Sequence, residues 1–274
     1  MVDGRTAFIS GAATGIGRAM AQRLAAHGCP LALADWDGDG LRDTAASVAT
    51  PVLTRQLDVR DRDAQADFAA EVAAWAPAPL GMVFNNAGVS VLQAVDGANV
   101  EDDDWVMGIN FQGVVNGVRA FLPLLLRQGE GVIVNTSSVY ALIAMPYYSA
   151  YSASKFAVRG FTDSLRLELR GTGVRAVTVF PGGVQTGIVR AARMRAPQDG
   201  ADLSSEERIR SSEARARTTP ERAVEIIHEG VNAGHARILV GGDARLMYLL
   251  SRVSPVRYLE ILESAGSGLR RLRR

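Results

Sequence analysis

The stretch FISGAATGIGRAMAQRL, residues 8–24, joins a short apolar run, a glycine turn and a helix-patterned segment. Glycines at positions 11, 15 and 17 permit a tight turn and a close approach to the backbone. The helix that follows offers free N–H groups and the positive end of its dipole, which suits an anion such as pyrophosphate. The spacing G-x-x-x-G-x-G differs from the G-x-G-x-x-G dinucleotide fingerprint. Glycines that serve only strand and helix packing therefore stay open as an alternative.

Seven apolar runs alternate along the chain with longer segments rich in Ala, Arg and Leu. The runs are RTAFIS (5–10), PLALAD (30–35), VLTRQL (52–57), GMVFNN (81–86), GVIVNTSS (131–138), GVRAVTVF (173–180) and ARILVG (236–241). This alternation predicts successive βαβ units, and hence an α/β fold with a doubly wound parallel sheet of about seven strands and helices on both faces. Strands that are apolar throughout are expected when both faces are buried.

The composition indicates a single domain over residues 1–274. The chain is 47% hydrophobic and carries a formal net charge of +1, so no overall field attracts nucleic acid or an anionic membrane. The start, MVDGRTAFIS, lacks a basic segment followed by a long apolar run, and FLPLLL (121–126) is too short to span a bilayer. We therefore expect a cytoplasmic protein.

Cys29 is the sole cysteine, which excludes an internal disulfide and favours a buried apolar role.

Asp35 ends the second predicted strand, 18 residues after Gly17, where a carboxylate can accept hydrogen bonds from ribose hydroxyls. A 2′-phosphate there would meet a like charge, and only Arg18 and Arg42 are nearby cations. The sequence therefore favours NAD over NADP. Asp58, after the third strand, is a second candidate cofactor contact, although it is equally suited to cap the helix that follows.

Tyr151 and Lys155 of YSASK (151–155) are four residues apart, so on a helix they share one face. Lys155 is the only lysine in a chain with 29 arginines. A phenol that works as an acid or base at neutral pH needs its pKa lowered by roughly 3 units, or about 4 kcal/mol. One positive charge at about 4 Å contributes about 4 kcal/mol at an effective dielectric constant near 20. A compact ammonium is therefore expected here, although chance retention of one surface lysine would leave the same spacing.

Further motifs follow in order along the chain: NNAG (85–88), Asn110 in GINFQG, NTSS (135–138) and PGGVQT (181–186). Together with SGAATGIG (10–17) and YSASK, they resemble those of the short-chain dehydrogenase/reductase family over about residues 4–242. The resemblance implies a Rossmann-like fold and hydride transfer between NAD(H) and a secondary alcohol or ketone. A non-catalytic NAD(H)-binding sensor on the same fold is the alternative, and an epimerase or dehydratase is a third possibility whose usual substrate domain does not fit this length.

The resemblance also implies roles for individual residues. Tyr151 is expected to be the general acid/base, and Lys155 to hold the nicotinamide ribose and lower the pKa of Tyr151. Ser138 is expected to hydrogen-bond the substrate oxygen, with Ser137 structural. Asn110 is expected to kink its helix and hold a water of a proton relay, whereas without the resemblance it would be read as a satisfied polar group inside a helix.

The expected cofactor contacts come from the strand ends and the glycine turn, with Asn86 to Gly88 supporting the adenosine side and Thr186 contacting the carboxamide, helped by backbone at Val184 or Gly183. They are Gly11, Thr14, Gly15, Ile16, Gly17, Asp35, Asp58, Val59, Asn86, Ala87, Gly88, Tyr151, Lys155, Pro181, Gly182, Val184 and Thr186. His27, His228 and His235 are scattered along the sequence, so no metal site is expected.

Residues 184–219 form a long connection rich in Pro, Gly, Ser and charge, which is typical of a substrate lid. The apolar segment VYALIAMPYYSA (139–150) is expected to line a pocket for a hydrophobic substrate, unless half of it simply packs under the lid. Arg190, Arg193 and Arg195 either receive an anionic substrate or lie on a solvated helix face, and the second is the simpler interpretation.

Residues 243–274 extend beyond the family's usual ending and close on LRRLRR. We expect a packed helix and a frayed basic end, with a cover over a neighbouring subunit's site or a weak contact with an anionic membrane surface left open. The resemblance implies that helices over 100–128 and 151–170 form a subunit interface, hence a homodimer or homotetramer.

Overall fold

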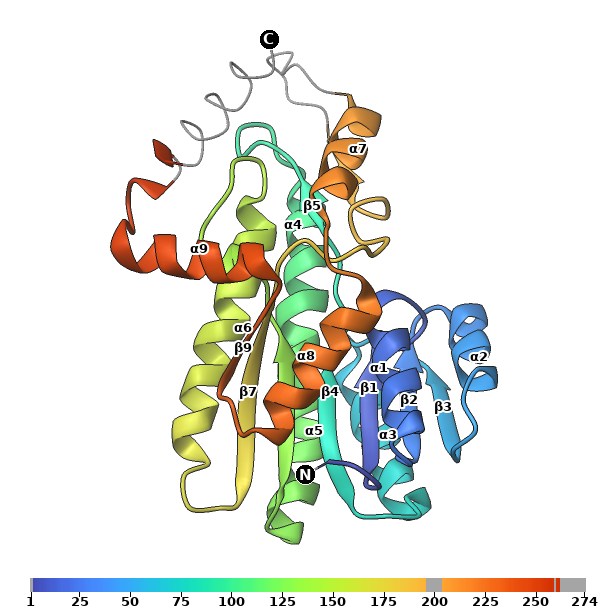
Figure 1. The fold of residues 1–274 in the computed structure, drawn as a ribbon. Helices are drawn as coiled ribbons and strands as arrows, with labels where there is room; N and C mark the ends of the chain where they lie inside the picture. Colours follow the sequence, from blue (N-terminus) through green and yellow to red (C-terminus); the bar gives the residue numbers. More distant parts are fainter. Residues whose placement is uncertain (1, 196–203, 259, 262–274) are drawn as a thin grey trace.

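The computed structural model describes residues 2–195, 204–258, 260 and 261. Its main sheet has seven parallel strands in the order β3-β2-β1-β4-β6-β7-β9. The strands are β1 (Thr6–Ser10), β2 (Leu31–Asp35), β3 (Val52–Gln56), β4 (Leu80–Asn85), β6 (Gly131–Thr136), β7 (Val174–Pro181) and β9 (Arg237–Val240). All seven predicted strands, the parallel sheet and the helices on both of its faces are therefore confirmed (Figure 1).

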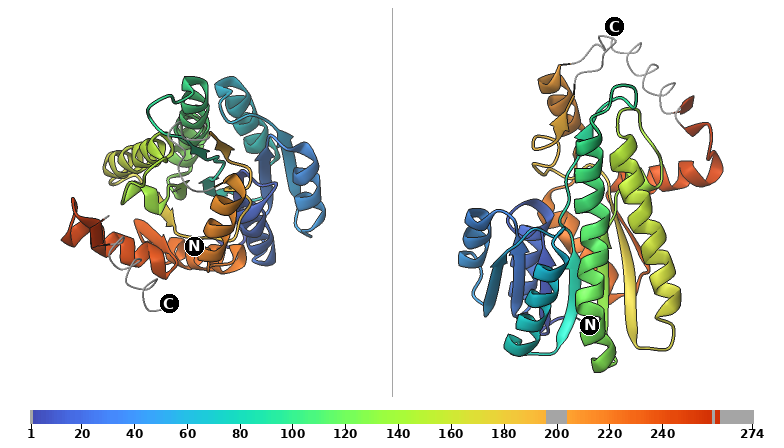
Figure 2. Two further views of the ribbon diagram at one scale, coloured as in Figure 1. Left: turned by 90° about the horizontal axis from the view of Figure 1, so that it is seen from above. Right: turned by 180° about the vertical axis from the view of Figure 1, so that it is seen from behind.

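Helices cover both faces of this sheet (Figures 1 and 2). The α-helices of the described residues are α1 (Gly15–Ala26), α2 (Gly38–Ala46), α3 (Arg62–Trp75), α4 (Val100–Met107), α5 (Gly113–Gln128), α6 (Ser149–Glu168), α7 (Ser205–Arg215), α8 (Pro220–Asn232) and α9 (Gly242–Val253), of which α7 and α9 lie at the carboxyl end of the sheet and not on its faces. One core cluster joins the sheet to α1 and α8, and a second joins its other face to α3, α5 and α6. Two such cores explain why the strands are apolar on both sides.

The chain order reverses in the middle of the sheet, where β1 has β2 on one side and β4 on the other. In open α/β sheets, ligands bind at the carboxyl ends of the strands beside such a switch point. The glycine turn follows β1, the NNAG turn follows β4 and Ser138 follows β6, so all three motifs meet at this edge.

A second sheet is very small and joins two distant segments. Its strands, β5 (Val91–Leu92) and β8 (Arg193–Met194), pair in parallel. This ladder attaches the first part of the lid to the loop after β4. Two-residue strands have no periodic signal, so the sequence did not predict it.

The segment Val100–Gln128 is one continuous helical run, in which the π-helical turn η1 (Gly108–Gln112) separates α4 from α5. By length and composition it is apolar enough to cross a membrane, but half of the tested window is buried inside this protein. Packing of α5 against α3 and β4 makes it a core helix.

Cys29 is fully buried, and its Sγ donates a hydrogen bond to the Val2 carbonyl at 3.4 Å. Burial is the main reason that the pKa of this thiol is raised. The expected role as a small buried side chain is confirmed.

Candidate active site

The glycine turn holds the amino end of α1 against the turn after β4. Gly11 has φ +69°, and a Cβ there would lie 2.7 Å from the Ala87 Cα. A Cβ on Gly17 would lie 1.9 Å from the Gly11 carbonyl oxygen. These two glycines are therefore required by packing alone, as the alternative interpretation of the motif proposed.

The amino end of α1 nevertheless suits an anion. Thr14 is the N-cap residue and makes no side-chain cap hydrogen bond, and the first turn, which includes Ile16, contains no acidic residue. Thr186 lies beside this turn, because a Cβ on Gly15 would be 3.2 Å from its Cγ2. The first backbone N–H groups of the helix and the positive dipole end thus meet the motif that follows β7.

Asp35 ends β2 next to the glycine turn. Its Oδ2 accepts from the Ala13 N–H at 2.8 Å, and its Oδ1 accepts from the Asp37 N–H at 3.0 Å. Each carboxylate oxygen has a further lone pair, so the fixed carboxylate can still accept from hydroxyl groups.

The two cations near Asp35 are both engaged elsewhere. Arg18 donates to the Thr44 hydroxyl at 3.0 Å and to the Gly40 carbonyl at 3.2 Å. Arg42 is paired with Asp39 on the exposed face of α2. Neither contact directs a guanidinium toward the Asp35 carboxylate.

Asp58 does not cap the helix after it. The Asp61 side chain does so, accepting from the N–H groups of Asp63 and Ala64. The Asp58 carboxylate instead binds Arg60, with a 2.6 Å contact to Nη2. That hydrogen bond is the main reason that the pKa of Asp58 is lowered. Because Asp61 caps the helix, the cap alternative for Asp58 was wrong. Val59, the next residue, is buried.

The turn Asn86–Gly88 links the two halves of the site. The N–H groups of Asn86 and Ala87 lie 3.1 and 3.3 Å from the Ser10 hydroxyl. A Cβ on Gly88 would lie 3.3 Å from both the Asn110 Oδ1 and the Lys155 Nζ. Gly88 therefore lets the amide and the ammonium approach the same piece of backbone.

Tyr151 and Lys155 lie on one face of α6, as their spacing predicts. Their residues are only 8% and 3% exposed, and the Lys155 Nζ is 5.7 Å from the centre of the Tyr151 ring. The ammonium donates to the Thr136 carbonyl at 3.2 Å. A hydrogen bond joins Tyr151 to Ser138. The structure thus brings together Ser138, Tyr151 and Lys155, three of the four residues expected to form the catalytic site.

The pKa of Tyr151 moves in the direction opposite to our expectation. Burial raises it to about 12, while the hydrogen bond with Ser138 lowers it in part and neighbouring Tyr148 raises it further. Burial also lowers the pKa of Lys155 to about 8. For each group, the loss of hydration disfavours the charged form more than attraction between phenolate and ammonium favours it, because both groups are buried.

Asn110 lies in the π-helical turn η1, which confirms the expected distortion of its helix. Its Oδ1 accepts from the Val89 N–H at 2.8 Å, and its Nδ2 lies 3.0 Å from both the Val89 carbonyl and the Ser154 hydroxyl. Ser154, inside the YSASK motif, thus positions Asn110, a role that the sequence analysis missed. Ser137 is also structural, since its hydroxyl donates to the Lys155 carbonyl.

Aromatic rings form the wall next to Tyr151. Tyr140, Tyr148 and Tyr151 pack edge to face, with ring centres 4.9 to 6.2 Å apart. Burial raises the pKa of Tyr140 as well. This wall consists of the segment that was expected to line a hydrophobic pocket.

The lid arginines do not lie on a solvated helix face, so that expectation was wrong. Arg193 and Arg195 bind the two oxygens of buried Asp102 at 2.7 and 2.8 Å. The Arg193 guanidinium also stacks 3.8 Å over the ring of Trp105. Burial raises the pKa of Asp102, but its hydrogen bonds with the two arginines prevail and lower it. This pairing could not be predicted, since Asp102 is one acid in the run EDDD.

The third lid arginine, Arg190, pairs with Glu213 of α7 at 2.6 Å. Residues 196–203 of the predicted lid lie outside the described residues.

The motif after β7 is held by the C-terminal extension. The Gly183 N–H donates to the Asp243 Oδ2 at 2.6 Å, and a Cβ on Gly182 would lie 2.2 Å from the Asp243 Oδ1. Val184 forms an isolated β-bridge with Thr218. Asp243 therefore positions the turn that starts after Pro181, which the sequence analysis did not foresee.

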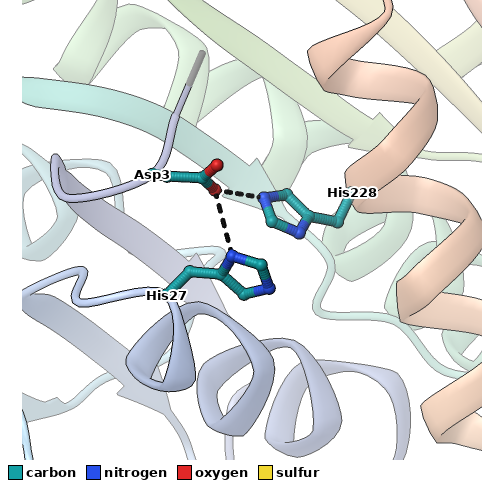
Figure 3. A group of neighbouring side chains, drawn as sticks. All are labelled: Asp3, His27 and His228. Atoms are coloured by element: carbon teal, nitrogen blue, oxygen red, sulfur yellow. Dashed lines mark hydrogen bonds and ion pairs between the residues drawn. The ribbon is translucent and has the colours of Figure 1, made fainter.

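His27 and His228 are not scattered in space, contrary to our expectation. Their rings lie 4.6 Å apart, and both face Asp3 (Figure 3). The His228 Nε2 is 2.7 Å from the Asp3 Oδ1, and its Nδ1 accepts from the Arg23 Nε at 3.1 Å. A metal ion on Nε2 requires a proton on Nδ1, which would meet the Arg23 donor. We therefore interpret this group as a satisfied hydrogen-bond network.

Comparison with known proteins identifies the family. The family model described as short chain dehydrogenase matches residues 5–196. The chain belongs to this family. It is an oxidoreductase of the short-chain dehydrogenase type, and its seven-stranded sheet is the family's Rossmann-like fold.

Two sequence relatives and one solved structure show how close the likeness is. SadH of Mycobacterium tuberculosis, whose name places it among oxidoreductases, is 38% identical over 95% of this chain and 94% of its own. The 2-(R)-hydroxypropyl-CoM dehydrogenase of Xanthobacter autotrophicus is 38% identical over 66% of this chain and 75% of its own. A short-chain dehydrogenase/reductase of Burkholderia phymatum, solved with NAD, has a TM-score of 0.80 at 30% identity, covering 91% and 93% of the two chains.

Proposed function

We propose that this short-chain dehydrogenase transfers a hydride between NAD(H) and an apolar secondary alcohol or its ketone. The observation that carries the proposal is the convergence of Ser138, Tyr151 and Lys155 at the carboxyl edge of the sheet, with Asn110 held next to them. Ser138 follows β6, Tyr151 and Lys155 lie on α6, and Asn110 lies in η1, so three separate elements supply the site.

The cofactor site fits a dinucleotide. The amino end of α1 has no side-chain cap and suits the pyrophosphate, and Asp35 is fixed where it can accept from ribose hydroxyls. Arg18 and Arg42 are both engaged on α2, so neither of these two cations is set to receive a 2′-phosphate. The related structure from B. phymatum is a complex with NAD. NAD is therefore favoured over NADP.

Each residue of the site has its own role in the proposed reaction. NAD, when bound, supplies the hydride acceptor. Tyr151 takes the hydroxyl proton of the alcohol, and Ser138 holds the same oxygen by a hydrogen bond. The Lys155 Nζ and the Asn110 Oδ1 both lie 3.3 Å from the position of a Gly88 Cβ. Of the two, the Lys155 ammonium can exchange a proton, and Asn110 would hold a water that carries the proton onward.

Apolar surroundings favour an apolar substrate. The tyrosine wall borders Tyr151, and the arginines that could have met an anion, Arg193 and Arg195, are bound to Asp102. The name of the X. autotrophicus relative describes a secondary alcohol dehydrogenase, but its substrate is not transferred to this chain.

The test is turnover of secondary alcohols and ketones, followed by NADH absorbance, for the wild type and Tyr151→Phe. We expect the variant to lose at least about a hundredfold in kcat because the proton has no acceptor, with NADH affinity kept. Equal rates would contradict the role of Tyr151. NADH binding without tyrosine-dependent turnover would instead identify a cofactor sensor, and a preference for NADPH would contradict the role of Asp35.

A further inference from the structure

Helix α9 carries an exposed apolar stripe. Ala244 is its one buried residue, whereas Leu246, Leu249 and Val253 are 51%, 58% and 75% exposed. Residues at this spacing lie on one side of a helix. Val256, 85% exposed, follows directly after the helix. Monomeric soluble proteins rarely leave such a contiguous apolar surface uncovered.

Positive charge borders the stripe. Arg245 and Arg252 are seven residues, or about two helical turns, apart, so they project along the same edge of the stripe. Both are exposed. The Arg252 Nη2 donates to the Tyr248 hydroxyl at 3.1 Å. Asp243, the only acid of α9, is bound to Gly183.

The C-terminal extension as a whole is also positively charged. Residues 243–274 contain seven arginines and three acidic residues, a net charge of +4, so the rest of the chain carries −3 of the total of +1. The basic excess is therefore confined to this one end of the sequence.

The stripe lies next to the active site. Helix α9 runs outward at the end of the molecule where the strands finish (Figures 1 and 2). Just beyond it, the Tyr258 hydroxyl accepts from the Ala144 N–H at 2.8 Å. Ala144 belongs to the segment between Ser138 and Tyr151, so a surface docked on α9 would adjoin the entrance for an apolar substrate.

We propose that the face formed by Leu246, Leu249, Val253 and Val256, with Arg245 and Arg252 at its edge, docks on an anionic lipid bilayer. Apolar side chains beside arginines are the composition of helices that lie in the membrane interface. A second copy of the chain is a poorer occupant, because antiparallel twofold packing of α9 centred on the stripe would bring Arg245 of one copy near Arg252 of the other. This docking is independent of the proposed reaction, so the failure of either leaves the other standing.

The test is flotation of the full-length protein with vesicles of phosphatidylcholine alone, or with about 30 mol% phosphatidylglycerol. We expect binding to the anionic vesicles only, at least about tenfold weaker in Leu249→Ser/Val253→Ser and in Arg245→Glu, and reduced at about 0.5 M salt. Val95→Ser, at a 75% exposed position in the loop between β5 and α4, is the matched control and should bind like the wild type.

Three results would overturn the proposal: no binding by the wild type, equal binding to both vesicle types, or full binding by Leu249→Ser/Val253→Ser. Circular dichroism and NADH affinity establish that each variant is folded. A lower mass of the Leu249→Ser/Val253→Ser variant in light scattering would also overturn it, since the stripe would then be a subunit interface.

Discussion

At the scale of single residues, burying the charged Lys155 side chain lowers the free energy of unfolding. A fully buried ammonium whose pKa falls from 10.5 to about 8 loses roughly 3 kcal/mol of folding free energy when it is charged. The hydrogen bond from its Nζ to the Thr136 carbonyl offsets only part of that loss. We infer that the proposed site is less stable than an apolar one of the same shape.

Lys155→Met should therefore raise the free energy of unfolding at pH 7 by up to about 3 kcal/mol. Between pH 8 and 10.5 the unfolded wild type binds more protons than the folded one, so wild-type stability rises with pH there and the gain shrinks toward zero. Urea unfolding at pH 7 and 10.5 measures this. Arg170→Met, exposed at the end of the same helix, should change little at either pH. A gain that is equal at both values would contradict the explanation.

The same residues show what a sequence reveals about a site. Tyr151 and Lys155 are placed by helical periodicity, and Ser138 by the end of a strand, so their convergence follows from the motifs. The sign of the Tyr151 shift did not follow, because it depends on how completely the fold seals the phenol. The cap alternative for Asp58 was wrong for a related reason: residue spacing does not show that its carboxylate binds Arg60 while Asp61 caps the helix.

The pKa of about 12 in turn predicts the effect of pH on the proposed reaction. Alcohol oxidation needs Tyr151 as the phenolate, so its rate should rise with pH, while ketone reduction should fall. The positive charges of NAD⁺ and Lys155 should bring the apparent pKa of kcat well below 12, and Lys155→Ala should move it back up. A pH profile of kcat for both proteins, with NAD⁺ saturating, checks this. An unchanged profile in the variant would contradict the role of Lys155.

At the scale of elements, the clamp between α4 and the lid is the feature that the sequence could not reveal. Asp102 and the pair Arg193 and Arg195 are about 90 residues apart, and β5 and β8 are too short to show a pattern. The inner strands of the main sheet were predictable because they are buried on both faces and therefore almost wholly apolar.

Asp102→Asn should loosen this clamp, since both guanidinium groups lose the charge that binds them. We expect about 1–3 kcal/mol lower stability and a several-fold higher KM for the alcohol, with NADH affinity unchanged. Steady-state kinetics and NADH titration measure the two effects separately. Glu101→Gln, on the exposed side of α4, is the control. A higher dissociation constant for NADH would show that Asp102 acts on the cofactor instead.

At the scale of the whole molecule, two of its surfaces remain partly apolar. One is the α9 stripe, and the other lies on α5 and α6, where Leu126 and Phe156 are 43% and 42% exposed. The family resemblance implies subunit contact through α5 and α6. We therefore expect an oligomer built on that face.

Phe156→Arg should lower the mass measured by light scattering to that of a smaller assembly, because a charge would be buried in each subunit contact. Leu249→Arg on α9 should leave the mass unchanged. If the second variant dissociates and the first does not, the subunit interface lies on α9.

The sealed thiol of Cys29 also has a practical consequence for observing the lid. Because it is the sole cysteine and fully buried, maleimide reagents have no native partner to compete with an introduced one. A spin label or fluorophore on Arg190→Cys would therefore report from that single point, with the native cysteine left in place. Any movement of the segment that carries Arg190 could then be followed in real time as cofactor and alcohol are added.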